Sequence, residues 1–214
     1  MRGDKRTIIS GVRGTSMKPV ALMILLSIAA AAGDDKTPFK AGPAASYPNH
    51  QTNEKITIAA VPYVTEEQAR SAFGKANPAK YGVVPVLVVI QNDTGKALRL
   101  DLEAEYIDPG NRHVDATPAS DVIYIGAEIK KPHLPGGGAS PIPLPSHQKK
   151  GPLNTPEIET RAFTPKMVPA GESASGFFYF QTANIPGSKL YLTGLKDAAS
   201  GKDYFYFEIP FDVK

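Results

Sequence analysis

Apolar and polar positions are patterned most regularly between residues 83 and 107. Residues 83–90 form an almost unbroken apolar run of strand length, rich in β-branched side chains. Residues 98–107 then alternate, with Leu98, Leu100, Leu102, Ala104 and Tyr106 in one set and Arg99, Asp101, Glu103 and Glu105 in the other. A period of two places each set on its own face of a pleated strand. Because Asn, Asp and Gly occupy the turn between the runs, we expect an antiparallel hairpin with one solvent-exposed face.

The other elements follow similar patterns. Residues 55–64 predict a strand that ends near Pro62, and residues 65–74 predict a short helix capped by Thr65 and stopped by Gly74. Further short strands are expected at residues 113–115, 121–129, 173–181, 190–195 and 204–211. Residues 157–163 fit either a helical turn or a short strand. About seven strands with one short helix predict an all-β, immunoglobulin-like antiparallel β-sandwich.

Two stretches lack such periodicity. Residues 34–53 are polar and interrupted by proline, so we expect a disordered lead-in to a sandwich domain at residues 54–214. Residues 130–156 contain seven prolines and a run of three glycines at residues 136–138. This composition predicts a long Pro/Gly-rich insert rather than a domain boundary, because the strands after it still need a partner sheet. The sequence does not decide whether the insert is functional.

The first 33 residues have the pattern of a secretory signal peptide. A basic start precedes an apolar run at residues 19–28 and the small residues 29–33, which predicts cleavage and export to the periplasm or the cell exterior. An uncleaved membrane anchor is the alternative, and Met17 is an alternative start residue.

The net charge is concentrated in the first 33 residues, which carry +4, so the total of +3 leaves −1 for the rest of the chain. This balance gives no support to nucleic-acid binding, and the absence of cysteine excludes disulfides.

Two stretches together resemble a known kind of domain. The first stretch is residues 86–108, whose last residues begin a Tyr-x-Asp-Pro-Gly sequence that continues to Gly110. The second stretch is residues 168–180, which read VPAGESASGFFYF. Both resemble exported bacterial immunoglobulin-like domains of the FxLYD and telokin-like kind. The resemblance implies an envelope or surface module that brings no catalytic residues and no cofactor. The Pro/Gly-rich insert and the helix at residues 65–74 depart from the simplest form of these domains, so the strand order stays open.

Asp101, Glu103 and Glu105 form the first candidate site. As alternate residues of one strand they share a face and could attract a divalent cation or a basic partner, although an ordinary solvated strand carries the same pattern. The four histidines are far apart in the sequence and none has a second ligand at metal-binding spacing. We therefore predict no metal site.

Tyr179, Tyr204 and Tyr206 form the second candidate site. In the last strand Tyr204 and Tyr206 alternate with Phe205 and Phe207, so the tyrosines should face away from the phenylalanines. Exposed, they would form an aromatic platform for a protein or a sugar ring, whereas beneath a second sheet they would belong to the core.

No group of residues has the spacing of a catalytic acid, base or nucleophile set. The Gly-Glu-Ser-Ala-Ser-Gly stretch at residues 171–176 does not form a serine-nucleophile turn, because it precedes an aromatic strand instead of a helix. The sequence therefore predicts a non-enzymatic exported protein-interaction module, without a cofactor, that binds an envelope or surface protein through the insert or an edge strand. The alternative is a β-sandwich that binds a small ligand or carbohydrate on its aromatic face.

Overall fold

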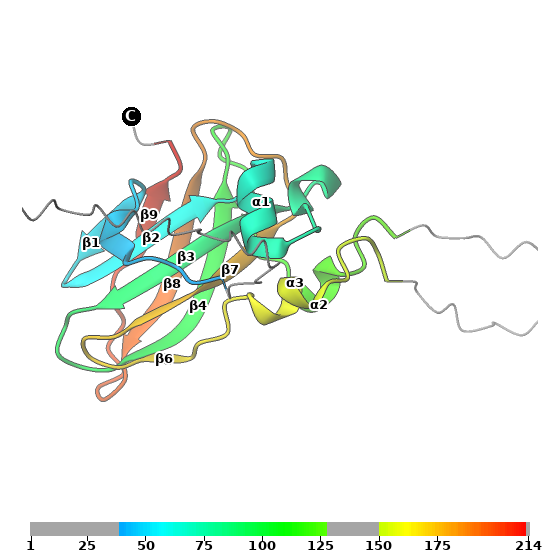
Figure 1. Cartoon of the computed structure of the whole chain (residues 1–214). Helices are drawn as coiled ribbons and strands as arrows, with labels where there is room; N and C mark the ends of the chain where they lie inside the picture. The colour runs from blue at the N-terminus through cyan, green and yellow to red at the C-terminus, as the bar shows by residue number, and fades with distance from the viewer. Residues whose placement is uncertain (1–38, 128–149, 213–214) are drawn as a thin grey trace, which may run out of the picture. The chain divides into compact units, whose positions relative to one another are not determined.

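A computed structural model describes residues 39–127 and 150–212, which form two antiparallel sheets packed face to face (Figure 1). The first, sheet A, has the order β1 (His50–Asn53), β2 (Ile56–Pro62), β3 (Val84–Asn92) and β7 (Ser173–Phe180). The second, sheet B, has the order β5 (His113–Asp115), β4 (Leu98–Ile107), β8 (Lys189–Asp197) and β9 (Phe207–Pro210), and β6 (Met167–Val168) also pairs with β4. The chain crosses between the sheets after β3, after β6 and after β7, as in immunoglobulin-like sandwiches. The predicted fold class is confirmed.

Short helices lie outside the sheets. They are α1 (Glu66–Phe73), α2 (Ala119–Val122) and α3 (Pro156–Thr160), with two 3-10 turns at Ala44–Ser46 and Pro78–Tyr81. The predicted helix is confirmed down to its cap, because Gln68 N–H donates to Thr65 Oγ1 at 3.2 Å and Thr65 N–H donates to Gln68 Oε1 at 3.1 Å. The last turn ends at Gly74, whose positive φ of 62° suits glycine.

β3 is buried on both faces, which explains its unbroken apolar run. One face, with Val86 and Val88, joins β4, β8 and β9 in the core between the sheets. The other face, with Leu87 and Val89, packs beneath the helices in a second cluster that contains Phe73. A strand that is covered on both sides needs apolar residues at every position.

The predicted hairpin between β3 and β4 is wrong. β3 pairs with β2 and β7 in sheet A, whereas β4 pairs with β5, β6 and β8 in sheet B. Residues 93–97 therefore cross from one sheet to the other. Turn residues at this point permitted a reversal, but they carry no information about which sheet the next strand joins.

The lead-in expected to be disordered differs from the structure over residues 39–53. β1 pairs with β2, Ala44 is fully buried, and the buried Asn49 donates from Nδ2 to the carbonyl oxygen of Phe211 at 2.6 Å. As a polar edge strand, β1 obtains its stability from main-chain pairing rather than from a hydrophobic pattern. Residues 1–33, which include the predicted signal peptide, lie outside the described residues.

Two predictions between residues 121 and 163 also need correction. The strand expected at residues 121–129 is not formed over residues 121–127, which are the end of α2 followed by turns. Val122 and Ile123 are adjacent and both buried, while Tyr124 is exposed. Most of the predicted insert lies outside the described residues, but Leu153 is fully buried and α3 begins at Pro156. The helical alternative for residues 157–163 is correct up to Thr160.

Candidate functional site

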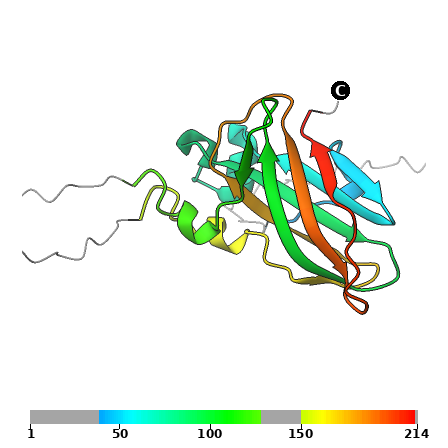
Figure 2. The ribbon, with the colours of Figure 1, turned by 180° about the vertical axis from the view of Figure 1, so that it is seen from behind.

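The strands of sheet B face the viewer in Figure 2. The outer face of this sheet carries exposed and half-buried aromatic and acidic side chains. Cross-strand register places Glu105 beside Tyr191, and Tyr191 beside Glu208. The Tyr206 ring leans on the Tyr191 ring, with 5.4 Å between centroids and 33° between planes. Tyr206 is 53% exposed and its neighbour Phe205 is 66% exposed. We call Glu103, Glu105, Tyr191, Phe205 and Tyr206 the outer patch.

The three predicted tyrosines do not form one face. Tyr206 is exposed, Tyr204 packs half-buried against the core between the sheets, and Tyr179 is buried in sheet A. The two tyrosines were expected to face away from the phenylalanines, but Phe205 and Tyr206 are both exposed. β9 begins only at Phe207, so the alternation of a strand does not extend to the preceding residues.

Tyr179 holds α3 against sheet A. Its hydroxyl donates to the carbonyl oxygen of Ile158 at 2.8 Å, and its ring packs against Phe73 and Phe177. Burial raises the pKa of Tyr179 above that of a free tyrosine. This residue therefore belongs to the core and offers no surface to a ligand.

Asp101, Glu103 and Glu105 do share one solvent-facing side of β4, but their environments differ. Asp101 lies 3.1 Å from Arg99 Nε and 3.8 Å from Lys196 Nζ, and Glu105 lies 2.6 Å from His113 Nδ1. Glu103 forms no ion pair within the described part of the chain. Within residues 39–127 and 150–212, no group of three His, Asp or Glu side chains could hold a metal ion.

A pocket of about 320 Å³ opens beside this acidic row. Its apolar wall consists of Leu102, Ala104, Ala116 and Phe178, and its acidic rim consists of Glu103, Glu105 and Asp115. We call it the side pocket. Sequence reasoning missed it, because only the fold brings β5 beside β4 and Phe178 beneath them. Nothing in the strand pattern distinguishes the half-buried Leu102 from the buried Leu100.

Asp197 is the acidic residue whose pKa is most clearly lowered, and its role is structural. Its carboxylate accepts hydrogen bonds from the N–H groups of Ser200 and Ala199, both at 2.9 Å, and from Lys96 Nζ at 3.0 Å. The Ser200 N–H, then the Lys96 ammonium, hold the pKa of Asp197 well below its usual range. The side chain closes the turn after β8 and ties it to the segment that crosses between the sheets.

Asp197→Asn should therefore lower the stability of the protein in a pH-dependent way. The folded state favours the ionised carboxylate, so its contribution is present above the unfolded-state pKa of about 4 and is lost as the pH falls further. We expect the variant to be less stable than the native protein at pH 7, with the difference shrinking below about pH 4. Urea unfolding of both proteins across this range measures the effect. A difference that stays constant with pH would contradict it.

Comparison with known proteins leaves the family open. No protein-family model matches the chain, and no curated protein matches it. Among solved structures, a candidate lipoprotein (ycdA) of Bacillus subtilis subsp. subtilis str. 168 is similar at 13% identity with a TM-score of 0.36. The match covers 76% of this chain and 38% of that protein, and at this TM-score it carries no argument. No helix in residues 39–127 or 150–212 is long and apolar enough to cross a membrane.

Proposed function

We propose that the protein is a non-enzymatic, exported interaction module that binds an envelope or cell-surface protein through the outer patch. The observation that carries this proposal is the exposed ring of Tyr206, which packs against Tyr191 beside the acidic residue Glu105. Its neighbour in the sequence, Phe205, is also exposed. Aromatic side chains are enriched in protein interfaces, because they provide a large apolar area and, in tyrosine, a polar end that tolerates water. Glu103 and Glu105 would add charge selectivity.

The titrating groups support a binding role over an enzymatic one. Tyr179 and Asp197, the two described residues with the largest pKa shifts, hold α3 and the turn after β8. Neither lines the side pocket. Catalytic groups with shifted pKa values usually lie together in a cleft, where they can reach a substrate. Export is supported by the signal-peptide pattern of residues 1–33.

A photo-crosslinking amino acid at position 206 tests the proposal in intact cells of the source organism. We expect one reproducible protein adduct at this position and none from the same group at position 124, where Tyr124 is 39% exposed on a turn after α2. Phe205→Ser should reduce the adduct at position 206 several-fold, because it removes exposed aromatic area from the interface. Mass spectrometry of the same sample should find a mature terminus near residue 34.

Two outcomes would contradict this proposal. Equal crosslinking at positions 206 and 124 would show that the outer patch is not a specific surface. Saturable binding of a saccharide that is lost in Tyr206→Ala, with no protein adduct, would favour the carbohydrate-binding alternative instead.

A further inference from the structure

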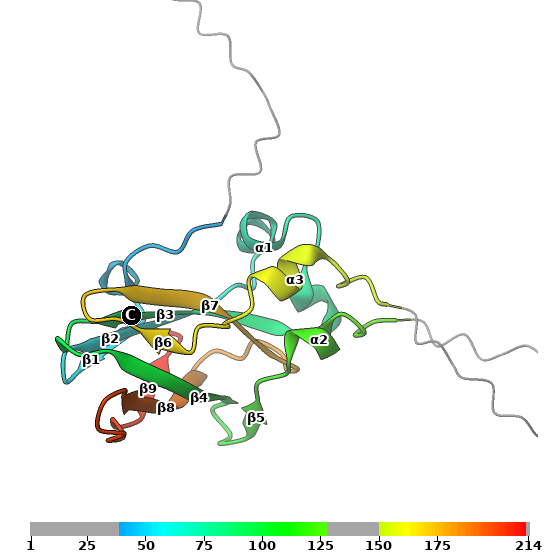
Figure 3. The same ribbon diagram turned by 90° about the horizontal axis from the view of Figure 1, so that it is seen from below.

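The edge of β4 that faces away from β8 is paired at both ends and open in the middle. β6 pairs with Leu98 and Arg99, and Leu100 N–H donates to the carbonyl oxygen of Lys166 at 2.9 Å. β5 pairs with residues 105–107, and Ala104 accepts from the N–H of Ala116 at 3.1 Å. Within the described residues, neither β5 nor β6 pairs with residues 101–103. Figure 3 shows β6 and β5 near opposite ends of β4. We call this open edge the β4 gap.

The β4 gap lies over the apolar wall of the side pocket. Leu102, at its centre, is half-buried and packs against the core between the sheets, as does Phe178 from the facing sheet. Phe163 stacks on Phe178 at 5.2 Å with 15° between the rings. A volume of about 320 Å³ is at the lower end for a small-molecule site. It suits one large apolar side chain.

The charged residues that line the side pocket beside the β4 gap are all acidic. Glu103 and Asp115 form no ion pairs in the part of the chain that the structure describes, and both line the side pocket with Glu105. A strand that pairs with β4 here would place its outward side chains directly opposite Asp101 and Glu103. Cross-strand pairs of opposite charge are stabilising and pairs of like charge are destabilising. The surroundings therefore favour a basic segment.

We propose that the β4 gap binds an extended basic segment of a partner protein by strand addition. The central residue of this segment pairs with Leu102 and places an apolar side chain in the side pocket. The residues before and after it are lysine or arginine and face the acidic side of β4. Main-chain hydrogen bonds then supply affinity, while the pocket and the carboxylates supply specificity. This inference rests on the proposed binding role and names the chemistry of the partner.

A second copy of this chain fits the β4 gap poorly. Two copies of β4 paired through this edge would bring two acidic rows together, including two unpaired Glu103 side chains. Like charges on adjacent strands oppose such pairing. A heterologous basic segment meets no such repulsion.

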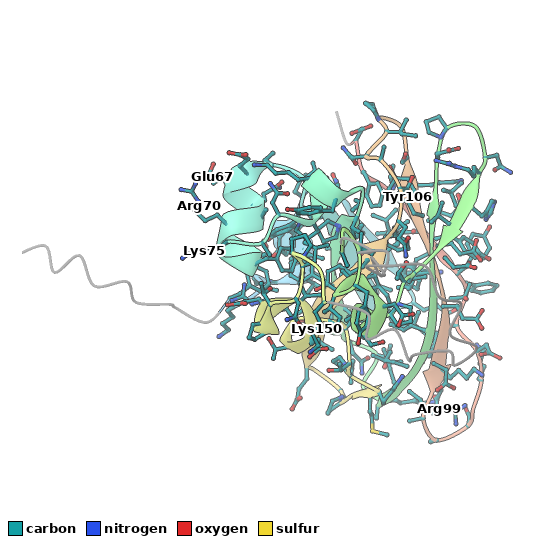
Figure 4. The ribbon with its side chains drawn as sticks, turned by 90° about the vertical axis from the view of Figure 1, so that its right-hand side faces the viewer. Glu67, Arg70, Lys75, Arg99, Tyr106 and Lys150 are labelled. Atoms are coloured by element: carbon teal, nitrogen blue, oxygen red, sulfur yellow. The ribbon has the colours of Figure 1, made fainter. Side chains whose placement is uncertain are left out.

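The test uses the purified full chain and an acetylated, fluorescent peptide, Ser-Gly-Lys-Leu-Lys-Gly-Ser, followed by fluorescence anisotropy. We expect saturable binding that weakens about tenfold when the leucine nitrogen is methylated, because one main-chain hydrogen bond is lost. Replacing the leucine by alanine should also weaken binding about tenfold, since it leaves the side pocket empty. Glu103→Gln should weaken binding about two- to fivefold. Glu67→Gln is the matched control, because this exposed carboxylate lies on α1, away from sheet B (Figure 4), and it should leave binding unchanged.

Several results would overturn the inference. They are the absence of binding at millimolar peptide, equal binding of the N-methylated peptide or of a peptide with glutamate in place of lysine, and self-association of the chain that the peptide does not reverse. If the peptide fails while crosslinking at position 206 persists, the β4 gap is excluded and the proposed function stands. Peptide binding through the β4 gap without a partner at position 206 would instead exclude the outer patch.

Discussion

Gly194→Ala should cost the protein about 3 kcal/mol or more of unfolding free energy, a large part of the stability of an ordinary domain. Gly194 lies in β8 with φ +84°, and a Cβ atom there would lie 2.0 Å from the carbonyl oxygen of Asp101. The positive φ costs about 1–2 kcal/mol in any L-residue. The overlap adds to this cost, because the atom that must move is a backbone oxygen of the neighbouring strand, β4. Urea unfolding monitored by circular dichroism measures the loss.

Gly201→Ala is the matched control. Gly201 has a similar φ of +71° in the turn after β8, but a Cβ atom there would meet nothing within 4 Å. Its substitution should cost only the backbone term, about 1 kcal/mol. If both variants lose the same stability, the contact with Asp101 is unimportant and only the conformation of Gly194 matters.

Gly194 also explains how β8 keeps apolar side chains on the inner face of sheet B both before and after the glycine. In β8, Leu190 and Leu192 are buried, and after Gly194 the buried residues are Leu195 and Asp197, so the alternation reverses. The pairing register between β4 and β8 shifts at the same place, between Leu100 and Glu103. The glycine absorbs this irregularity next to the β4 gap, so the conformation of the open edge depends on it. The Gly194→Ala variant should therefore also bind the basic peptide less well.

The class of fold was predictable because it depends on local patterns. The apolar run of β3, the alternation of β4 and the capping box of α1 each depend on residues close together in sequence. What could not be predicted depends on pairing at a distance. The hairpin prediction failed because β3 has two buried faces and needs neighbours from residues 56–62 and 173–180. β1 is polar and is held by backbone bonds that leave no hydrophobic signal.

The candidate site divides in the same way. The acidic face of Asp101, Glu103 and Glu105 was predictable, since one strand and a period of two define it. The tyrosine face was not, because Tyr179 belongs to the other sheet and Tyr204 precedes the start of β9. The side pocket depends on three separate segments, which are residues 102–105, residues 115–116 and Phe178. No single stretch of sequence contains such a site.

Asn92→Ala should destabilise the protein by about 2–4 kcal/mol, because hydrogen bonds from the side chain of Asn92 hold the segment that crosses from β3 to β4. Asn92 is fully buried at the end of β3. Its Nδ2 lies 2.7 Å from the carbonyl oxygen of Lys96 and 3.0 Å from those of Val168 and Pro169. Its Oδ1 accepts from Thr94 N–H and Thr94 Oγ1. Alanine would remove all of these hydrogen bonds, including the buried one to the carbonyl oxygen of Val168.

The expected loss is specific to this position, so Asn184→Ala serves as the control. Asn184 is exposed, and its substitution should change the unfolding free energy by no more than about 0.5 kcal/mol.

Asn92→Asp tests the role of the Nδ2 donor, because it keeps the size and the acceptor oxygen of the side chain but removes the donor. Three carbonyl oxygens would then face a carboxylate, so we expect a loss at pH 7 at least as large as that of alanine, and a smaller one below about pH 4, where aspartate is protonated. Equal stability of Asn92→Asp and the native protein at pH 7 would show that the Nδ2 hydrogen bonds do not hold the crossing between the two sheets.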